Sequence, residues 1–140
     1  MRLSTKARYA VRALVDLGAH ENGTPLQIKD IAARENLSVR YLENLFTLLR
    51  SANILKSSKG KNGGFLLARN PEDITIREII EVVEGDLAVV SCVIMPDSCD
   101  KALNCTTRKV WNKMSKALIN TLNSITLAEL IADYKKIKSF

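Results

Sequence analysis

Three cysteines, the only ones in this 140-residue chain, lie close together at Cys92, Cys99 and Cys105, with six and then five residues between them. An odd number of thiols cannot all pair within one chain, and thiols this closely spaced are hard to explain as core packing. Thiolates suit zinc and iron–sulfur clusters because these are soft metal centres, and they also undergo redox chemistry. The spacing therefore indicates a metal, a cluster or a thiol switch.

The composition indicates a folded protein in which these thiols stay reduced. Hydrophobic residues make up 46% of the chain and charged residues 26%, as in ordinary globular domains. No apolar run approaches the ~20 residues of a membrane span, and the first residues lack the apolar core of a secretory signal. We therefore expect a cytoplasmic protein with no membrane partner, where a reducing environment disfavours structural disulfides.

Positive charge is concentrated in the first half of the chain. The formal net charge is +6; residues 1–70 hold twelve Lys/Arg against five Asp/Glu, and residues 71–140 hold nine against ten, which gives +7 and −1. Such an asymmetry is typical of proteins that bind a polyanion such as nucleic acid, although it also serves solubility.

Apolar residues spaced by three and four predict helices over residues 5–20, 27–35 and 38–51. The last two are joined by a tight turn at residues 35–38, and Ser38 is a good N-cap for the third helix. The third helix has a predicted core stripe of Val39, Leu42, Leu45, Phe46 and Leu49. This is the helix-turn-helix arrangement, so the third helix would enter the DNA major groove.

A β-hairpin is predicted next, with strands over 54–58 and 65–68 and a basic, Gly-rich tip over 59–64. The tip lacks a P-loop consensus, which argues against nucleotide binding and favours a DNA-binding wing. A capping box at Thr75 and Glu78 opens another helix, which Gly85 ends. Residues 86–106, which contain Pro96 and all three cysteines, show no sustained helical period, and so long a loop usually has a function.

A long helix is predicted over residues 106–124, and Thr126 begins a shorter one. A nearly heptad-spaced stripe along the long helix indicates pairing with a second copy. The predicted dimer residues are Val110, Trp111, Met114, Leu118, Leu122 and Ile125. The expected fold is mainly α with a small β-hairpin wing. Its regions are a winged helix-turn-helix domain (1–85), a cysteine-bearing sensor loop (86–106), and a dimerisation helix with C-terminal tail (107–140).

Three motifs make the chain resemble the Rrf-type winged-helix regulators, the family of IscR, NsrR and CymR. Residues 2–11 (RLSTKARYAV) look like the opening signature of the family, 41–50 (YLENLFTLLR) like its recognition helix, and 60–65 (GKNGGF) like its wing. The resemblance covers nearly the whole chain. It implies a homodimeric transcription regulator that binds double-stranded DNA at palindromic operators, and RNA polymerase is a further candidate partner.

The resemblance also implies that Cys92, Cys99 and Cys105 occupy the positions of the ligands of an iron–sulfur cluster, and 2Fe-2S is favoured over 4Fe-4S. Air readily removes a cluster of either type. A regulator that carries such a cluster would sense iron, cluster supply, oxygen or nitric oxide. The fourth ligand departs from the family: the matching positions hold Arg108 and Arg8, and a guanidinium offers no lone pair to iron. The open alternatives are Asp97, Asp100, Glu84, Asp86, a water, a small thiol or an open position.

The residues expected to contact DNA fall into two groups. Ser38, Arg40, Tyr41, Glu43 and Asn44 on the third helix are predicted to contact base edges or adjacent phosphates. Glu43 would accept from a cytosine amino group or orient an arginine, and otherwise pairs with Arg40 or Arg50 on the helix surface. The second group, Arg2, Lys6, Lys56, Lys59 and Lys61, is predicted to neutralise phosphates.

Other functions remain to be weighed against a cluster-dependent regulator. Within regulation, the alternatives are a cluster-free thiol switch or cysteine-metabolism regulator of the same fold, and structural zinc. An enzyme is not expected, because the chain has no Cys-x-x-Cys pair and His20 is its only imidazole. His20 is interpreted as a surface residue that the helix dipole favours. An interaction module without DNA is disfavoured by the basic wing and the polar recognition face.

Overall fold

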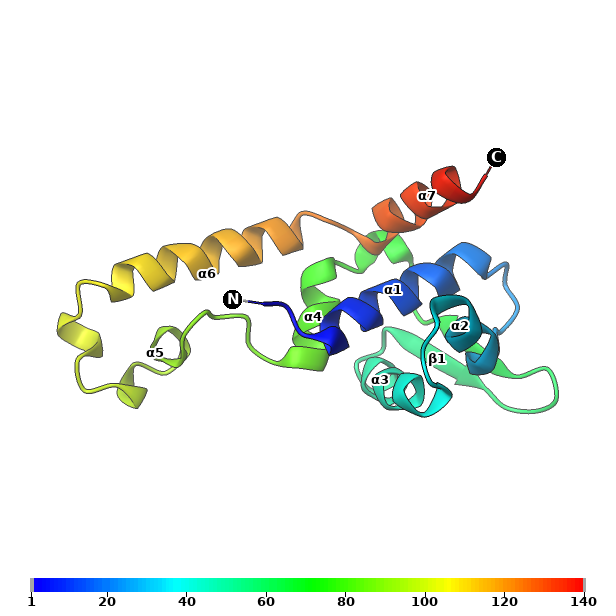
Figure 1. Ribbon diagram of the computed structural model, residues 1–140, viewed down its shortest axis with the longest axis horizontal. Helices are drawn as coiled ribbons and strands as arrows, with labels where there is room; N and C mark the ends of the chain where they lie inside the picture. The colour runs from blue at the N-terminus through cyan, green and yellow to red at the C-terminus, as the bar shows by residue number, and fades with distance from the viewer. Residues whose placement is uncertain (1, 140) are drawn as a thin grey trace.

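A computed structural model of the protein describes residues 2–139 (Figure 1). The chain is mostly helical with one two-stranded hairpin, which confirms the predicted fold class. Its elements are α1 (Thr5–His20), α2 (Ile28–Glu35), α3 (Val39–Ser51), β1 (Leu55–Ser58), β2 (Gly64–Leu67), α4 (Ile76–Glu84), α5 (Ser91–Ile94), α6 (Arg108–Asn123) and α7 (Leu127–Lys138). Single 3-10 turns cover Pro71–Asp73, Pro96–Ser98 and Ala102–Asn104.

The helix boundaries follow local capping. Ser4, Ser38, Thr75 and Thr126 each accept a hydrogen bond from the backbone N–H three residues later, at the starts of α1, α3, α4 and α7. This satisfies one of the N–H groups that the first turn of a helix leaves free. Asn36, in the left-handed conformation at φ 55°, ends α2 and makes the tight turn to α3. The helix-turn-helix is therefore formed where the sequence predicts it.

One hydrophobic core joins α1, α2, α3, α4, β1 and α7. Its largest fully buried side chains include Leu14, Ile31, Phe46, Ile79 and Leu127. In α3 the predicted core stripe holds at Leu42, Leu45, Phe46 and Leu49. The inclusion of Val39 in that stripe is wrong: its side chain is 38% exposed, because the first residue of α3 lies beyond the edge of the core.

The wing is an antiparallel hairpin in which Leu55 pairs with Leu67 and Ser58 pairs with Gly64. A backbone bridge holds the wing against the start of α2: Phe65 N donates to Leu26 O at 2.8 Å, and Leu26 N donates to Phe65 O at 3.0 Å. Gly64 makes this close approach, because a Cβ there would meet the Leu26 carbonyl oxygen. The hairpin is therefore fixed to the helix-turn-helix at its base while its tip stays exposed.

The last helix, α7, returns to the N-terminal unit and packs along α1 (Figure 1). Leu127 and Ile131 are buried in the common core. Two backbone hydrogen bonds hold the connection: Ile76 N donates to Ile125 O at 2.9 Å, and Leu127 N donates to Ile74 O at 2.8 Å. The packed unit therefore extends beyond residue 85 and includes the C-terminal helix, which the sequence grouped with the dimerisation region.

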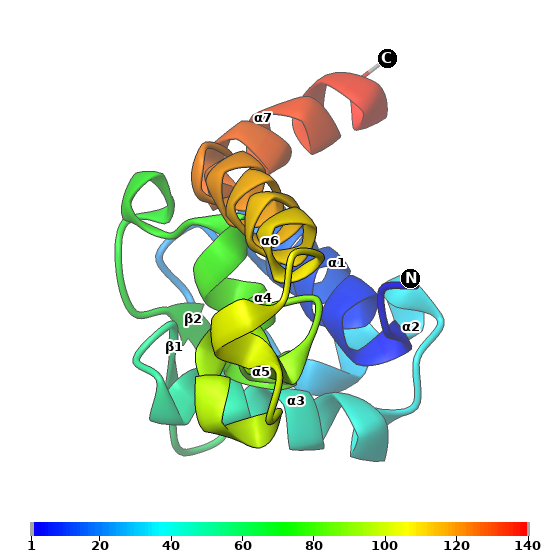
Figure 2. The ribbon, with the colours of Figure 1, turned by 90° about the vertical axis from the view of Figure 1, so that its left-hand side faces the viewer.

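Residues 86–126 form an arm whose base packs against this core through Leu122 and Ile125 and whose far end extends away from it (Figure 1). Seen along α6, the segment with α5 lies beside α6 (Figure 2). Two hydrogen bonds join them: Val89 N donates to Ser115 Oγ at 3.1 Å, and Arg108 Nε donates to Cys92 O at 3.1 Å. The cysteine segment holds only single helical turns, in agreement with its lack of a sustained helical period.

Candidate nucleic-acid interface and cysteine segment

The recognition helix α3 presents a polar face to solvent. Arg40, Glu43 and Asn44 are exposed, while the opposite side of the helix is buried in the core. Ser38 is exposed at the start of the helix, where its hydroxyl accepts from Tyr41 N at 3.1 Å. Four of the five predicted base-reading residues therefore lie where a groove could meet them, and their contacts with DNA stay a prediction.

Tyr41, the fifth residue, is placed differently. Its side chain is half-buried and its ring meets the Tyr9 ring edge-on, with centroids 5.9 Å apart. Its hydroxyl is buried and has no hydrogen-bond partner within residues 2–139. Burying a hydroxyl without a partner is costly, and a buried oxygen is not accessible to DNA in this arrangement, so the structure places Tyr41 apart from the other four residues.

The carboxylate of Glu43 makes no ion pair with any residue that the structure describes. Arg50, which the sequence offered as a surface partner for Glu43, instead donates to Ser57 Oγ at 3.3 Å. That bond links α3 to the wing. Glu43 is therefore left exposed and available to a donor outside this chain.

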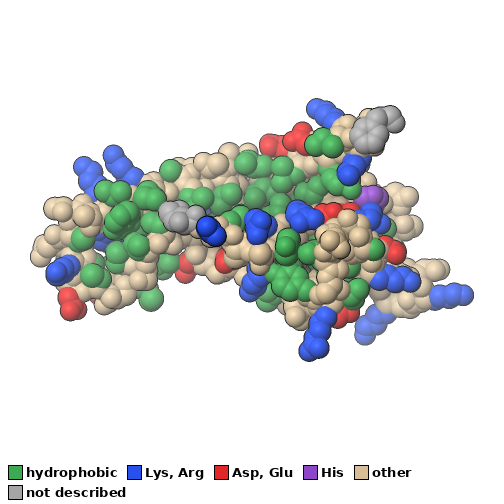
Figure 3. Space-filling view, in the orientation of Figure 1, with side chains coloured by type: hydrophobic (Ala, Val, Ile, Leu, Met, Phe, Trp, Pro, Cys, Tyr) green, Lys and Arg blue, Asp and Glu red, His purple; other side chains and the backbone are tan. Residues whose placement is uncertain are grey.

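The predicted phosphate contacts are all exposed lysines or arginines of the winged-helix unit: Arg2, Lys6, Lys56, Lys59 and Lys61. The last three belong to β1 and the tip of the wing. In the space-filling view, basic side chains project around this unit (Figure 3). Exposed cations of this kind gain from counterion release when they meet a phosphate backbone.

An ion pair beneath the helix-turn-helix was not anticipated from the sequence. Asp16 is fully buried, and Arg34 donates to it from Nε at 3.0 Å and from Nη2 at 2.7 Å. This hydrogen bonding raises the pKa of Arg34 above its ordinary value. The pair fixes α2 against α1. Its only sequence signal was an aspartate among core positions of a helix.

His20, at the end of α1, lies beside this pair. Its Nδ1 is 2.8 Å from the Asp16 carbonyl oxygen and 3.7 Å from the Asp16 carboxylate. The imidazole ring meets Tyr134 of α7 edge-on, with centroids 5.9 Å apart. The side chain is 37% exposed, in agreement with its interpretation as a surface residue.

The three cysteines lie on different turns of the arm. Cys92 in α5 and Cys105 before α6 are half-buried, Cys99 is exposed, and all three are free thiols. Within residues 2–139, no three His, Cys, Asp or Glu side chains lie close enough together to hold a metal ion. The donor types suit an iron–sulfur cluster or zinc, but this arrangement does not bring three donors together, so binding would require the segment to rearrange.

Cys105 has the most distinctive surroundings of the three thiols. Its Sγ is 3.1 Å from Thr107 Oγ1, and the backbone N–H groups of Arg108 and Thr107 also face it. Hydrogen bonding by Thr107, followed by that of Arg108, lowers the pKa of Cys105 below its ordinary value, and Lys101 adds to the effect.

The two arginines at the ligand positions of the family have other contacts here. Arg108 holds the Cys92 carbonyl, and the Arg8 guanidinium lies 5.9 Å from the centroid of the Tyr9 ring. The acidic alternatives Glu84, Asp86, Asp97 and Asp100 are all exposed. The fourth ligand therefore stays open.

The predicted dimer stripe lies along α6. Val110 is 49% exposed and Met114 37% exposed, unusually high for large apolar side chains placed on one face. Trp111 and Leu118 are half-buried. Leu122, in the last turn of α6, and Ile125, in the connection to α7, pack partly against the core. The surface is available for a second copy, and dimerisation stays a prediction.

Together, the helix-turn-helix, the hairpin against its side and the exposed polar face of α3 define a winged-helix DNA-binding protein. Comparison with known families gives the particular family: residues 3–133 match Rrf2, described as an iron-dependent transcriptional regulator. The chain belongs to the Rrf2 family. It is therefore a DNA-binding transcriptional regulator and not an enzyme, as the sequence predicts.

Individual relatives agree with this assignment. The chain is 39% identical to protein rrf2 of Nitratidesulfovibrio vulgaris over 133 residues, which cover 95% of this chain and 89% of the relative. It is 36% identical to the transcriptional regulator IscR of Photobacterium profundum, covering 95% of this chain and 77% of that protein.

Two solved structures share the fold. The structure of T. potens IscR has a TM-score of 0.81 and 37% identity, covering 100% of this chain and 93% of that one. The structure of CymR, the global cysteine regulator of B. subtilis, has a TM-score of 0.78 and 33% identity, covering 94% of this chain and 97% of that one.

No helix within residues 2–139 has the length and hydropathy needed to traverse a bilayer.

Proposed function

We propose that this protein is a homodimeric regulator whose affinity for a palindromic operator is set by an iron–sulfur cluster on Cys92, Cys99 and Cys105. The observation that carries the proposal is the position of the cysteine segment, between the winged helix and the apolar stripe of α6. Similarity to IscR proteins supports the cluster, and three thiols within fourteen residues supply suitable donors.

For DNA binding, we assign base reading to the exposed face of α3 and backbone contacts to the wing. Arg40 and Asn44 carry donors that suit purine edges, and Glu43 can accept from cytosine N4. Lys59 and Lys61 at the tip would each neutralise one phosphate. Two copies related by a two-fold axis would read the two halves of a palindrome.

For dimerisation, the exposed Val110 and Met114 supply the centre of a self-complementary surface. Burying a large apolar side chain stabilises an interface by about 1.5–3 kcal/mol. The operator then fixes how far apart the two α3 helices must lie, and the arm that carries α6 determines that distance.

For sensing, Cys92, Cys99 and Cys105 would hold the cluster, which supplies a centre that iron supply, oxygen or nitric oxide can alter. The chain itself supplies the connection to the dimer surface. Arg108 ties the Cys92 turn to the start of α6, and Ser115 ties the preceding segment to its middle. A coupling of about 1–3 kcal/mol through these bonds would change operator affinity by about 5- to 150-fold.

A cluster-free thiol switch is the second candidate, because Cys105 has hydrogen bonds that favour its thiolate. Similarity to CymR, described as a cysteine regulator, also supports this alternative. In that case an oxidant would take two electrons from two of the three thiols, which lose their protons and join as a disulfide.

The deciding experiment is an absorbance spectrum after oxygen-free purification, with iron and sulfide analysis, followed by operator binding. We expect absorbance between about 320 and 460 nm, as Cys-ligated iron–sulfur clusters show, and iron that disappears in a Cys92→Ala, Cys99→Ala, Cys105→Ala variant. Equal operator affinity of that variant and the loaded protein would defeat cluster control. Colourless protein with an oxidant-dependent affinity would favour the thiol switch, and one zinc per chain would favour a structural metal.

A further inference from the structure

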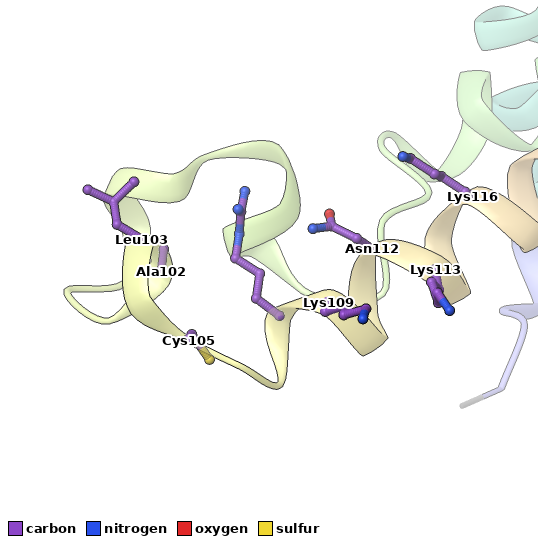
Figure 4. A pocket seen from close by; sticks show the side chains of 8 residues that line it. Ala102, Leu103, Cys105, Lys109, Asn112, Lys113 and Lys116 are labelled. Atoms are coloured by element: carbon purple, nitrogen blue, oxygen red, sulfur yellow. The ribbon is translucent and has the colours of Figure 1, made fainter.

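A cavity of about 360 Å³ lies where the turn after Cys99 meets the basic side of α6. Its lining comes from two sides, the turn just before α6 and the first three turns of the helix (Figure 4). The lining residues are Ala102, Leu103, Cys105, Arg108, Lys109, Asn112, Lys113 and Lys116. The hollow is open to solvent and its lining is mainly polar, which suits a charged ligand.

The lining is strongly positive. It includes Arg108 and three lysines, and none of the described lining residues is acidic. Lys109, Lys113 and Lys116 follow one another at steps of four and three, so they share one face of α6. No residue of the described chain forms an ion pair with these four cations. Gathered like charges repel, and a bound anion would relieve that repulsion.

The start of α6 adds to the positive potential. Unlike α1, α3, α4 and α7, this helix has no side-chain cap, and its first turn contains no acidic residue. The free N–H groups of a first turn carry about half a positive charge. Arg108 and Lys109 lie in this turn, so the helix end and the side chains act in the same direction.

The cavity is separate from both surfaces assigned to the regulator. The three lysines centre about 130° around the axis of α6 from the stripe of Val110, Met114 and Leu118, so a dimer formed through that stripe would be centred on a different side of the helix. It also lies on the arm, at the opposite end of the molecule from the wing (Figures 1 and 3). Basic side chains at that end stand apart from those of the DNA-binding unit.

We propose that this cavity is a binding site for a small molecule carrying two or more anionic groups, either carboxylates or phosphates. The four cations of the lining can pair with two or more anionic groups. An apolar side for the carbon skeleton of the ligand is supplied by Ala102 and by Leu103, whose side chain is 89% exposed. The site reaches the cysteine segment through Arg108, whose Nε holds the Cys92 carbonyl while its terminal nitrogens remain as donors for the ligand.

This coupling to the cysteine segment rests on the proposed sensing function. Binding of the anion does not rest on it, because the site belongs to the cluster-free arrangement of the segment, in which Cys105 lines the cavity. An anion held by Arg108 and the lysines would order the Cys92 turn against α6. The ligand would thereby add a second input to operator affinity.

The test is calorimetric titration of the full chain with pyrophosphate and, separately, with citrate. We expect one probe to bind with a dissociation constant below about 1 mM. Lys109→Ala with Lys113→Ala should weaken that binding by at least about tenfold, or about 1.4 kcal/mol. A matched double variant of exposed lysines on α7, Lys135→Ala with Lys136→Ala, should change it by no more than about twofold, because screening weakens distant charges.

Location is tested through Cys105 in a Cys92→Ser, Cys99→Ser background. Saturating the tighter probe should slow the reaction of Cys105 with a neutral maleimide, because the ligand covers the thiol in the cavity wall. Tighter binding of pyrophosphate supports a phosphate ligand, and tighter binding of citrate supports a carboxylate ligand.

Three results would overturn the proposal. The first is that both lysine double variants weaken probe binding equally. The second is that neither probe binds with a dissociation constant below about 1 mM. The third is that the bound probe leaves the rate of the Cys105 reaction with maleimide unchanged. Operator binding is measured beside them: if the α6 pair weakened DNA binding as much as Lys59→Ala, the lysines would belong to the DNA interface instead. Failure of anion binding with intact operator binding would leave the regulator function standing.

Discussion

The winged-helix unit and the cysteine-bearing arm differ in how many of their side chains are buried. The unit encloses a core that draws side chains from six elements, and α7 closes it from the far end of the chain. In residues 86–126, all of which the structure describes, only Ala102 and Ser115 are buried. The unit is thus held by its own packing, whereas the arm has little buried core of its own. Reading DNA needs a fixed surface, and sensing needs a segment whose order can change.

The largest expected effect follows from removing a core side chain of the winged-helix unit. Phe46 is fully buried and meets Phe65 edge-on at 5.0 Å. Phe46→Ala should lower the free energy of unfolding by about 3–5 kcal/mol through the lost burial and the cavity left behind. Val110→Ala on the arm should change it by less than about 0.5 kcal/mol in dilute protein, measured by urea unfolding. Similar losses in both variants would remove the contrast between the two regions.

The next effect concerns the ion pair that joins α1 and α2. Arg34→Ala leaves the fully buried Asp16 carboxylate without its arginine partner and should cost about 3 kcal/mol of unfolding free energy. The matched control is Glu81→Ala, which breaks the partly exposed pair with Arg77 at 2.8 Å and should cost about 0.5 kcal/mol or less. Equal costs would mean that the buried pair does not hold the helix-turn-helix in place.

A smaller effect is expected at the wing. Lys59→Ala should weaken binding to any DNA duplex and lower the slope of log affinity against log salt by about 0.9, because one phosphate contact is lost. Fluorescence anisotropy over a salt series measures this slope. Lys101→Ala, an exposed lysine on the arm, is the control and should leave it unchanged. An unaltered slope in Lys59→Ala would remove this lysine from the interface.

The smallest effect probes Cys105. Its pKa lies below the ordinary value mainly because Thr107 donates to the thiolate, so Thr107→Val should raise it. In a Cys92→Ser, Cys99→Ser background the thiolate fraction near pH 7 then falls, and alkylation slows. Above both pKa values the thiol is fully ionised in either protein, and the rates should converge. Thr106→Val is the matched control, and a pH profile of iodoacetamide reaction that coincides for all three proteins would contradict the assignment.

Much of the winged helix was predictable because its signals are local. Each capping residue accepts a hydrogen bond from the N–H three positions later, as at Ser38, Thr75 and Thr126. The spacing of apolar residues in each helix indicates which face is buried. Val39 shows the weakness of this reasoning: its spacing fits the stripe, but its position at the end of α3 leaves it exposed. Periodicity describes a face of a helix and not how far the core extends along it.

The candidate site likewise has features that the sequence predicts and features that it does not. The exposed polar face of α3 and the basic tip of the wing follow from residue type and turn chemistry, so the sequence predicts them. The edge-on contact of Tyr41 with Tyr9 does not, because the two residues lie thirty-two positions apart in the chain. The cavity beside α6 likewise forms only where the turn at Ala102 meets the lysines of that helix.

The sequence alone determined the order of elements, the helix-turn-helix with its wing, and the thiols available for chemistry, since capping, periodicity and side-chain identity act over a few residues. The tertiary structure decided that α7 completes the core, that Arg34 meets Asp16, and that, among the described residues, the three cysteines do not gather into a metal-binding group. Those outcomes depend on contacts between segments far apart in the chain. Such contacts form when they bury apolar surface and pair opposite charges across the whole fold. A short stretch of sequence does not contain that information.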